Sequence, residues 1–229
     1  MSEVRPLVIA PSILAANLAC MGEEARRAVA GGGDWLHVDI MDGHFVPNIS
    51  FGVDLLRMLR REVDEITLDV HLMIEQPDRY ARDYIENGAD ILTVHLEAHH
   101  NVPRTLRMIR DMGCRAGLAI NPLTLIENVY PLLPHVDLLL CMTVNPGFGG
   151  QAFIIEVLEK VREARKFIQE HQLNVDIEVD GGVGEITAGP AVTAGANVLV
   201  AGTSLFGKKD MGEAIANLRR KATEVTSAG

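Results

Sequence analysis

Cysteine is scarce in this chain of 229 residues and shows no disulfide or thiolate-metal spacing. The three cysteines, Cys20, Cys114 and Cys141, are an odd number, and no two form a Cys-x-x-Cys pair. A disulfide framework needs paired cysteines, and a thiolate zinc site needs closely spaced ones. The sequence therefore argues against both and favours a reducing compartment, so we expect a cytoplasmic protein.

Long apolar runs and blocks of positive charge are also missing. The longest apolar run covers only residues 138–142, whereas a membrane span needs about 18 residues. Lys and Arg number 21 against 31 Asp and Glu, which gives a net charge of −10. This balance disfavours binding to nucleic acid or to an anionic membrane surface. An anionic ligand would have to be held by local backbone dipoles.

The chain does contain a regular alternation of strand-like and helix-like segments. Strands are expected at 8–14, 35–41, 66–73, 91–97, 115–121, 138–144, 175–180 and 198–202, and helices at 18–31, 53–61, 77–87, 102–112, 125–132, 154–171, 186–194 and after Asp210. Apolar strands with long connections indicate parallel pairing, in an open doubly wound sheet or a closed barrel. Eight units without a second domain favour the barrel. We predict an α/β fold, a (β/α)8 TIM barrel, with residues 1–229 as one domain.

Polar side chains stand near the C-terminal ends of three predicted strands, where such barrels carry their active sites. His37 and Asp39 share one face of the second strand, His71 lies near the end of the third, and Asp180 ends the seventh. Any one of them could be a hydrogen-bonded core histidine or a helix-capping aspartate. Four at corresponding strand ends instead predict one divalent metal per chain. Two imidazoles and two carboxylates suit zinc, which we favour, or Fe(II), Co or Mn.

Glycine-rich stretches follow the last three predicted strands. They read NPGFGGQ at 145–151, DGG at 180–182 and AGTS at 201–204. Glycine lets backbone N–H groups converge on an anion, and barrels often bind phosphate after strands seven and eight. One such loop would be weak evidence, because turns also use glycine, but three on neighbouring strand ends predict a phosphate site.

Other polar and sulfur-containing side chains give weaker signals. His95 and Glu97 on the fourth strand look reactive, although inward polar residues can simply bond to their neighbours. Methionines end three strands, and they are interpreted either as core or as an apolar collar around the metal: Met41, Met73 and Met142. Four further histidines are predicted to lie at the surface: His99, His100, His135 and His171.

Long runs of the sequence resemble the ribulose-phosphate 3-epimerase family over nearly the whole chain. The matching runs are PSIL at 11–14, HVDIMDGHFVPN at 37–48, DVHLMI at 69–74, VNPGFGGQ at 144–151 and EVDGG at 178–182. The resemblance implies a barrel that interconverts D-ribulose 5-phosphate and D-xylulose 5-phosphate, as in the pentose phosphate pathway or the Calvin cycle. It also implies a metal held by His37, Asp39, His71 and Asp180. The substrate contacts that it implies are Ser12, His71, Gly147, Phe148, Gly149, Gly150, Gly181, Gly182, Gly202 and Thr203.

The chemistry of such a reaction agrees with the residues present. Removal of the C3 proton needs a base and an electrophile for the developing enediolate, and a metal at the C2 oxygen provides the electrophile. Inversion returns a proton to the opposite face, so two acid–base groups are needed, and Asp39 and Asp180 are the candidates.

Alternative functions remain open at this point. A related barrel that epimerises allulose 6-phosphate would use the same four ligands. The hexulose-phosphate synthase and ketogulonate-phosphate decarboxylase branch is disfavoured, because its Asp-x-Lys-x-x-Asp pattern would fall on residues 37–42, where the lysine is absent. A non-catalytic sugar-phosphate-binding barrel is disfavoured because every acid–base position is filled. Since barrels of this kind often form homo-oligomers, we expect one here.

Overall fold

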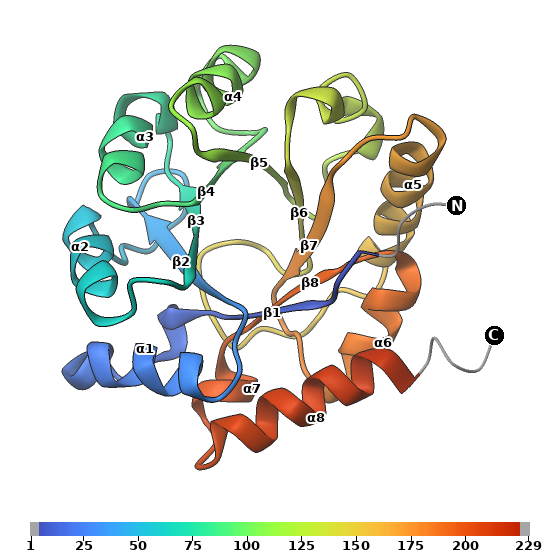
Figure 1. Cartoon of the computed structure of the whole chain (residues 1–229). Coiled ribbons are helices and arrows are strands. Elements are labelled where there is room, and N and C mark those ends of the chain that lie inside the picture. The colour runs from blue at the N-terminus through green and yellow to red at the C-terminus, as the bar shows by residue number, and fades with distance from the viewer. Residues whose placement is uncertain (1–4, 225–229) are drawn as a thin grey trace.

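Eight parallel strands form one ring, with the helices arranged around its outside (Figure 1). This computed structural model describes residues 5–224, so the predicted domain bounds of 1–229 extend beyond the described residues at both ends. The predicted (β/α)8 barrel is confirmed. Its strands are β1 (Val8–Pro11), β2 (Trp35–Met41), β3 (Thr67–Met73), β4 (Ile91–His95), β5 (Arg115–Ile120), β6 (Leu138–Met142), β7 (Asp176–Asp180) and β8 (Val198–Ala201).

The ring closes more weakly at one place than elsewhere. The hydrogen-bonded order is β1-β8-β7-β6-β5-β4-β3-β2, in which β1 and β2 are the two ends. Within residues 5–224, β1 and β2 form no ladder: Ser12, just after β1, makes an isolated bridge with His37, and Asp34, just before β2, donates its N–H to Ile9 O at 2.9 Å. Ser12 also donates its N–H to Ala201 O of β8 at 3.0 Å. The last bridge of the ring therefore lies beside the predicted metal ligand His37.

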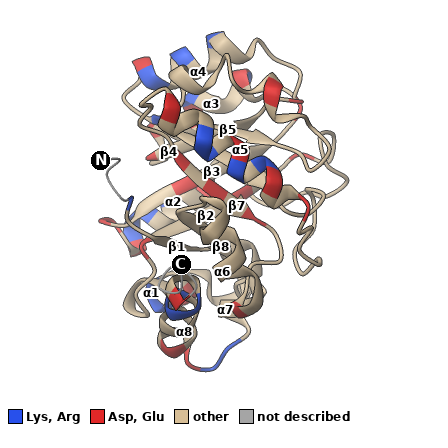
Figure 2. Ribbon diagram, turned by 90° about the vertical axis from the view of Figure 1, so that its right-hand side faces the viewer, with Lys and Arg blue, Asp and Glu red and all other residues tan. Residues whose placement is uncertain are grey.

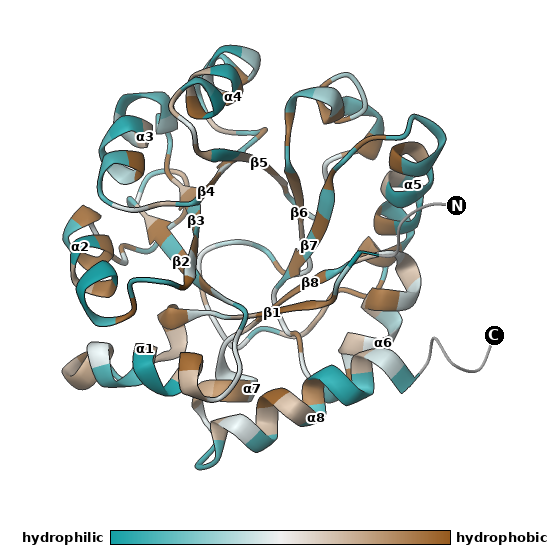
Figure 3. Cartoon of the chain, in the orientation of Figure 1, coloured by the Kyte–Doolittle hydropathy of each residue, from teal (hydrophilic) through white to brown (hydrophobic). Residues whose placement is uncertain are grey.

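Most of the outer helices are amphipathic and pack their apolar sides on the strands (Figure 3). In the longest predicted helix, now α5, the apolar residues at 3–4 spacing are buried, and Glu159 and Arg162 pair on the exposed side. Acidic and basic residues occur together on the outer helices in Figure 2. The helices are α1 (Met21–Ala30), α2 (Val53–Glu62), α3 (Pro77–Glu86), α4 (Val102–Asp111), α5 (Val157–Glu170), α6 (Glu185–Ala194), α7 (Thr203–Phe206) and α8 (Met211–Glu224).

The main departure from the predicted elements lies between β5 and β6. In place of the helix expected at 125–132, the chain forms the 3₁₀ helix Ile126–Asn128, and a second 3₁₀ helix, Leu133–His135, follows just beyond that segment. Pro131 and Pro134 explain the difference, because proline cannot donate an intrahelical hydrogen bond and disfavours the helical conformation of the residue before it. The apolar side of this segment is therefore buried by short turns packed on the barrel instead of by an α-helix.

Smaller differences occur at both ends of the chain. The first strand ends at Pro11, and the chain then enters the 3₁₀ helix Ile13–Ala15. Another 3₁₀ helix, Leu18–Cys20, is capped by Asn17, whose side chain accepts the Ala19 N–H at 3.1 Å, and α1 begins three residues later than expected. The short helix α7 after β8 was not expected from the sequence.

Candidate active site

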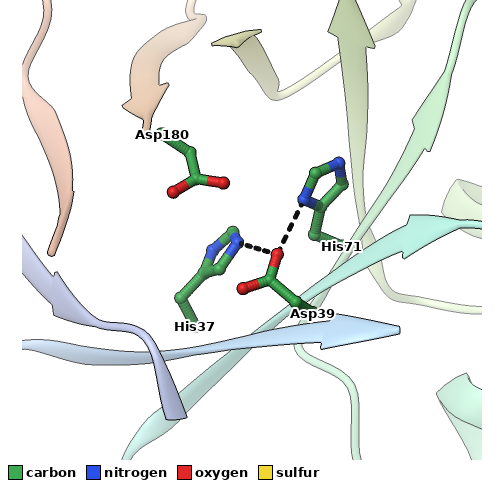
Figure 4. Close-up of side chains that lie close together, drawn as sticks. All are labelled: His37, Asp39, His71 and Asp180. Carbon is green, nitrogen blue, oxygen red and sulfur yellow. Dashed lines mark hydrogen bonds and ion pairs between the residues drawn. The ribbon is translucent and has the colours of Figure 1, made fainter. Parts of the chain in front are cut away.

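The strand ladders bring the four predicted metal ligands together. Asp39 of β2 lies beside His71 of β3 in the parallel register, and His37 lies on the same face of β2 as Asp39. Asp180 approaches from the end of β7, across the mouth of the barrel (Figure 4). One donor atom from each residue lies within 4.8 Å of the others. The predicted grouping of His37, Asp39, His71 and Asp180 is thus present in the structure.

Asp39 occupies the centre of this cluster. Its Oδ1 lies 3.2 Å from His37 Nε2 and 3.1 Å from His71 Nδ1. Its other oxygen, Oδ2, accepts a hydrogen bond from the Ser12 hydroxyl at 2.8 Å. His37, Asp39, His71 and Ser12 are buried, whereas Asp180 is partly exposed. The Ser12 hydroxyl is therefore in direct contact with the carboxylate of Asp39.

The electrostatics and the donor types both fit a divalent cation. Burial opposes the charged form of both carboxylates, but contacts with His37 outweigh burial at Asp39 and lower its pKa. Burial and the nearby charge of Asp39 raise the pKa of Asp180 to about 7. A cation between the two carboxylates would replace this repulsion by attraction. The N₂O₂ donor set suits zinc, Fe(II), Co or Mn better than Mg or Ca, which prefer oxygen ligands.

Two acidic residues behind His37 were not singled out from the sequence. His37 Nδ1 lies 2.6 Å from Asp69 Oδ2 and 3.5 Å from Glu178 Oε1. If His37 donates Nδ1–H to Asp69, its Nε2 lone pair faces the cluster, which is the arrangement typical of a metal-binding histidine. Burial and the neighbouring Asp69 raise the pKa of Glu178. The signal for both residues was their position, two residues before His71 and Asp180 on the same strand faces.

His95 and Glu97 continue the cluster on the side of His71. His95 is fully buried, and its Nε2 lies 2.8 Å from His71 Nε2. Its Nδ1 lies 3.1 Å from Glu97 Oε2. Burial lowers the pKa of His95 to about 4. His95 and Glu97 are therefore a hydrogen-bonded polar pair, and His95 also contacts the predicted metal ligand His71.

The outlying histidines and methionines mostly follow the sequence interpretation. His99, His135 and His171 are exposed as predicted. The prediction is wrong for His100, which is half-buried because its ring bonds to Thr105 Oγ1 at 2.8 Å and to His95 O at 3.0 Å. The three methionines are all buried. Met41 and Met73 pack together with Val46, as expected for part of a collar, whereas Met142 belongs to a separate core cluster.

The three glycine-rich loops adjoin one another beside the cluster. The Thr143 hydroxyl lies 2.8 Å from Asp180 O and 2.6 Å from Gly181 O and can donate its one hydrogen to either, which joins the ends of β6 and β7. The Ser204 hydroxyl donates to Val183 O at 2.8 Å, which joins the loop after β7 to α7. In the part of the chain that the structure describes, the N–H groups of Gly149 and Gly150 have no hydrogen-bond partner. The loops can therefore offer backbone donors to an anion.

We predict that Gly181→Ala destabilises the protein by at least about 1–2 kcal/mol, as measured by denaturant unfolding. Gly181 has φ +115°, and an added Cβ would lie 2.4 Å from Val144 Cγ2. Gly149→Ala is the matched control, because its φ is not positive and its Cβ would meet nothing within 4 Å. Equal stability of the two variants would contradict the prediction.

A closed ring of parallel strands with a buried His–Asp cluster at their C-terminal ends defines an α/β-barrel enzyme with a candidate metal centre. In residues 5–224, no helix combines the length and apolar character needed to cross a membrane. The sequence model of the ribulose-phosphate 3 epimerase family matches residues 8–206. The chain belongs to the ribulose-phosphate 3-epimerase family.

Curated relatives agree with this assignment over most of the chain. The chain is 46% identical over 212 residues to the ribulose-phosphate 3-epimerase of Bacillus subtilis, which covers 92% of this chain and 97% of that protein. It is 45% identical over 215 residues to the chloroplastic ribulose-5-phosphate-3-epimerase of Arabidopsis thaliana, covering 93% of this chain and 76% of that protein.

A solved structure supports the fold alone. The 3-keto-L-gulonate-6-phosphate decarboxylase of Vibrio cholerae superposes with a TM-score of 0.71 at 14% identity, covering 97% of this chain and 99% of that one.

Proposed function

We propose that this enzyme inverts C3 of D-ribulose 5-phosphate to give D-xylulose 5-phosphate, and catalyses the reverse reaction, in the pentose phosphate pathway or the Calvin cycle. The observation that carries the proposal is the meeting of Asp39 from β2 and Asp180 from β7 around one buried cluster. Kinship with the curated epimerases supports it.

One divalent ion per chain would be held by His37, Asp39, His71 and Asp180, and we favour zinc over Fe(II), Co or Mn. Such an ion supplies an electrophile that stabilises the negative charge developing on the C2 oxygen. Ser12 and His37 fix the position of Asp39 through the contacts described above.

The two catalytic carboxylates act from opposite sides of the substrate. Asp39 takes the C3 proton of ribulose 5-phosphate, which leaves an enediolate, and Asp180 delivers a proton to the opposite face of C3. Xylulose 5-phosphate reacts in the reverse sense, with Asp180 as base and Asp39 as acid. Each turnover moves one proton onto one carboxylate and one proton off the other, so the net charge of the pair is unchanged.

The loops after β6, β7 and β8 would hold the phosphate through backbone N–H groups. This is how a chain with a net charge of −10 can bind an anionic ester without a basic patch. The proposed substrate contacts are Ser12, His71, Gly147, Phe148, Gly149, Gly150, Gly181, Gly182, Gly202 and Thr203. Of these, Ser12 and His71 are buried, whereas Phe148 is 55% exposed beside the loop glycines.

The test is a coupled assay for xylulose 5-phosphate formation, run beside the same measurement with allulose 6-phosphate. A higher kcat/KM for ribulose 5-phosphate, with about one zinc per chain in the active sample, supports the proposal. A preference for allulose 6-phosphate would show that the enzyme is an allulose-6-phosphate epimerase. No turnover of either ester would favour a non-catalytic sugar-phosphate-binding protein.

Gly149→Val tests the phosphate site. We expect KM for ribulose 5-phosphate to rise strongly, since the larger side chain would stand where the Gly149 N–H must approach the anion. The folded structure has room for it, because a Cβ at Gly149 meets no atom within 4 Å. The measurement is steady-state kinetics together with thermal unfolding. An unchanged KM in a stably folded variant would show that phosphate binds elsewhere.

A phosphate-free ketopentose serves as the substrate control. We expect it to react very poorly with the unaltered enzyme, because binding energy from the phosphate supports orientation at C3. Equal kcat/KM with and without the phosphate would contradict a role for these loops.

The cellular setting is also part of the proposal. We infer a cytoplasmic enzyme, in agreement with the free state of Cys20, Cys114 and Cys141, of which the last two are buried. We further propose one domain over residues 1–229 and a homo-oligomer, which light scattering of the purified chain would test.

A further inference from the structure

A line of polar side chains leads from His71 away from the metal ligands and toward the loop after β5. His71 Nδ1 faces Asp39, and its Nε2 lies 2.8 Å from His95 Nε2. His95 Nδ1 lies 3.1 Å from Glu97 Oε2. The other oxygen of Glu97 accepts the Asn121 N–H at 2.8 Å and also the hydroxyl of Thr124. Two side chains in series, those of His95 and Glu97, thus connect the proposed metal ligand His71 to the backbone of the loop.

The hydrogen-bonding roles along this line follow from its two ends. A metal bound at Nδ1 requires the lone pair there, so His71 carries its hydrogen on Nε2. His95 Nε2 must then accept that hydrogen, which places the hydrogen of His95 on Nδ1. Glu97 accepts it as a carboxylate. Each bond then has one donor and one acceptor. The two bonds between side chains donate away from the metal, and Asn121 and Thr124 donate to Glu97 from the loop.

The opposite arrangement is disfavoured by the loop end of the line. Asn121 and Thr124 donate to one oxygen of Glu97, and the other oxygen, which as part of a carboxylate can only accept, lies 3.1 Å from His95 Nδ1. His95 must therefore offer N–H to the other oxygen and keep a lone pair on Nε2. His71 and His95 are fully buried, so water cannot replace a hydrogen-bond partner that either ring lacks. The Phe45 ring packs on the His95 ring with centroids 4.7 Å apart and helps to hold its orientation.

We propose that Glu97 and His95 are positioning residues that fix the tautomer of His71, so that its Nδ1 lone pair is directed to the metal. The inference rests on the metal site of the proposed function. Asp69 contacts His37 directly, and Glu97 would have the same role for His71, acting through the imidazole of His95.

Two substitutions test this line at different points, with zinc affinity measured by competition with a chromogenic chelator. His95→Leu removes the acceptor for His71 Nε2–H. Glu97→Gln keeps the shape but has one oxygen, which the two donors at Asn121 and Thr124 retain, so its NH₂ turns toward His95. We expect zinc binding to weaken by about 10–100-fold in both variants, as is typical when the partner of a metal-binding histidine is lost.

Two further variants separate this role from a general loss of packing. His95→Gln can accept from His71 through its amide oxygen and donate to Glu97 through its NH₂, so it should recover part of the affinity. Thr93→Val is the matched control, because Thr93 is buried on the same face of β4 and its hydroxyl has no partner within residues 5–224. We expect this control to bind zinc like the unaltered protein.

Nitrogen-detected NMR of the zinc-loaded, unaltered enzyme gives a readout that needs no substitution. The expected result is hydrogen on Nε2 of His71 and on Nδ1 of His95, with the His95 hydrogen moving to Nε2 in Glu97→Gln. Hydrogen on Nε2 of His95 in the unaltered enzyme would overturn the inference, as would unchanged zinc affinity in His95→Leu and Glu97→Gln. If the unaltered protein takes up no zinc, the metal site itself is wrong and the inference fails with it.

Discussion

Asp180→Asn is expected to stop inversion at C3 while proton removal on one face continues. Asp39 can still take the C3 proton of ribulose 5-phosphate, and it can return a solvent proton only to the face from which it took the first. In D₂O the variant should therefore place deuterium in recovered ribulose 5-phosphate and form little xylulose 5-phosphate. A general acid–base group contributes about 10²–10⁴-fold, so net epimerisation should fall by at least that factor.

The converse variant provides the internal comparison. Asp39→Asn should exchange the C3 proton of xylulose 5-phosphate and form little ribulose 5-phosphate. Both residues are also proposed ligands, so metal content must be measured in each sample and activities compared only in metal-loaded protein. Inversion at a near wild-type rate in either loaded variant would show that the assignment of two opposed carboxylates is wrong.

The second large effect is expected from removal of a metal ligand. His71→Ala should lower zinc occupancy and turnover together, by about 10²-fold or more, because one of four donors is lost. Metal analysis and the coupled assay are made on the same preparation, with the exposed His135→Ala as control. Full activity in a preparation shown to be free of metal would contradict a metal-dependent reaction.

The sequence predicted the barrel because its strands are short, apolar and separated by helices of clear 3–4 spacing. It failed at residues 125–132, where the same spacing occurs but Pro131, with Pro134 just beyond the segment, prevents a regular helix. Apolar spacing reports which side of a segment is buried. It does not report whether the backbone can supply the hydrogen bonds of an α-helix, and at this segment the prolines decide that question.

The metal ligands could be grouped from the sequence because a parallel barrel places all strand ends at one edge. The role of Ser12 could not, since its bond to Asp39 depends on how β1 meets β2 when the ring closes. The contact of His95 with His71 likewise depends on the register between β3 and β4, which sets His71 beside Thr93 and brings His95 in from further along β4. A single sequence carries no direct record of such registers.

The weak closure between β1 and β2 has a thermodynamic consequence. Asp180 is on β7, which is connected to β1 through β8, whereas His37 and Asp39 are on β2. An ion shared by these residues would cross-link the two sides of the junction, where the backbone has only the bridge between Ser12 and His37 and the bond from Asp34 N–H to Ile9 O among the described residues and no strand ladder. Binding to the native state alone adds about 2.7 kcal/mol of stability when free metal is at 100 times its dissociation constant. Metal supply would then set how often the barrel opens at this junction, and amide hydrogen exchange in β1 and β2 should speed up first when the ion is withdrawn.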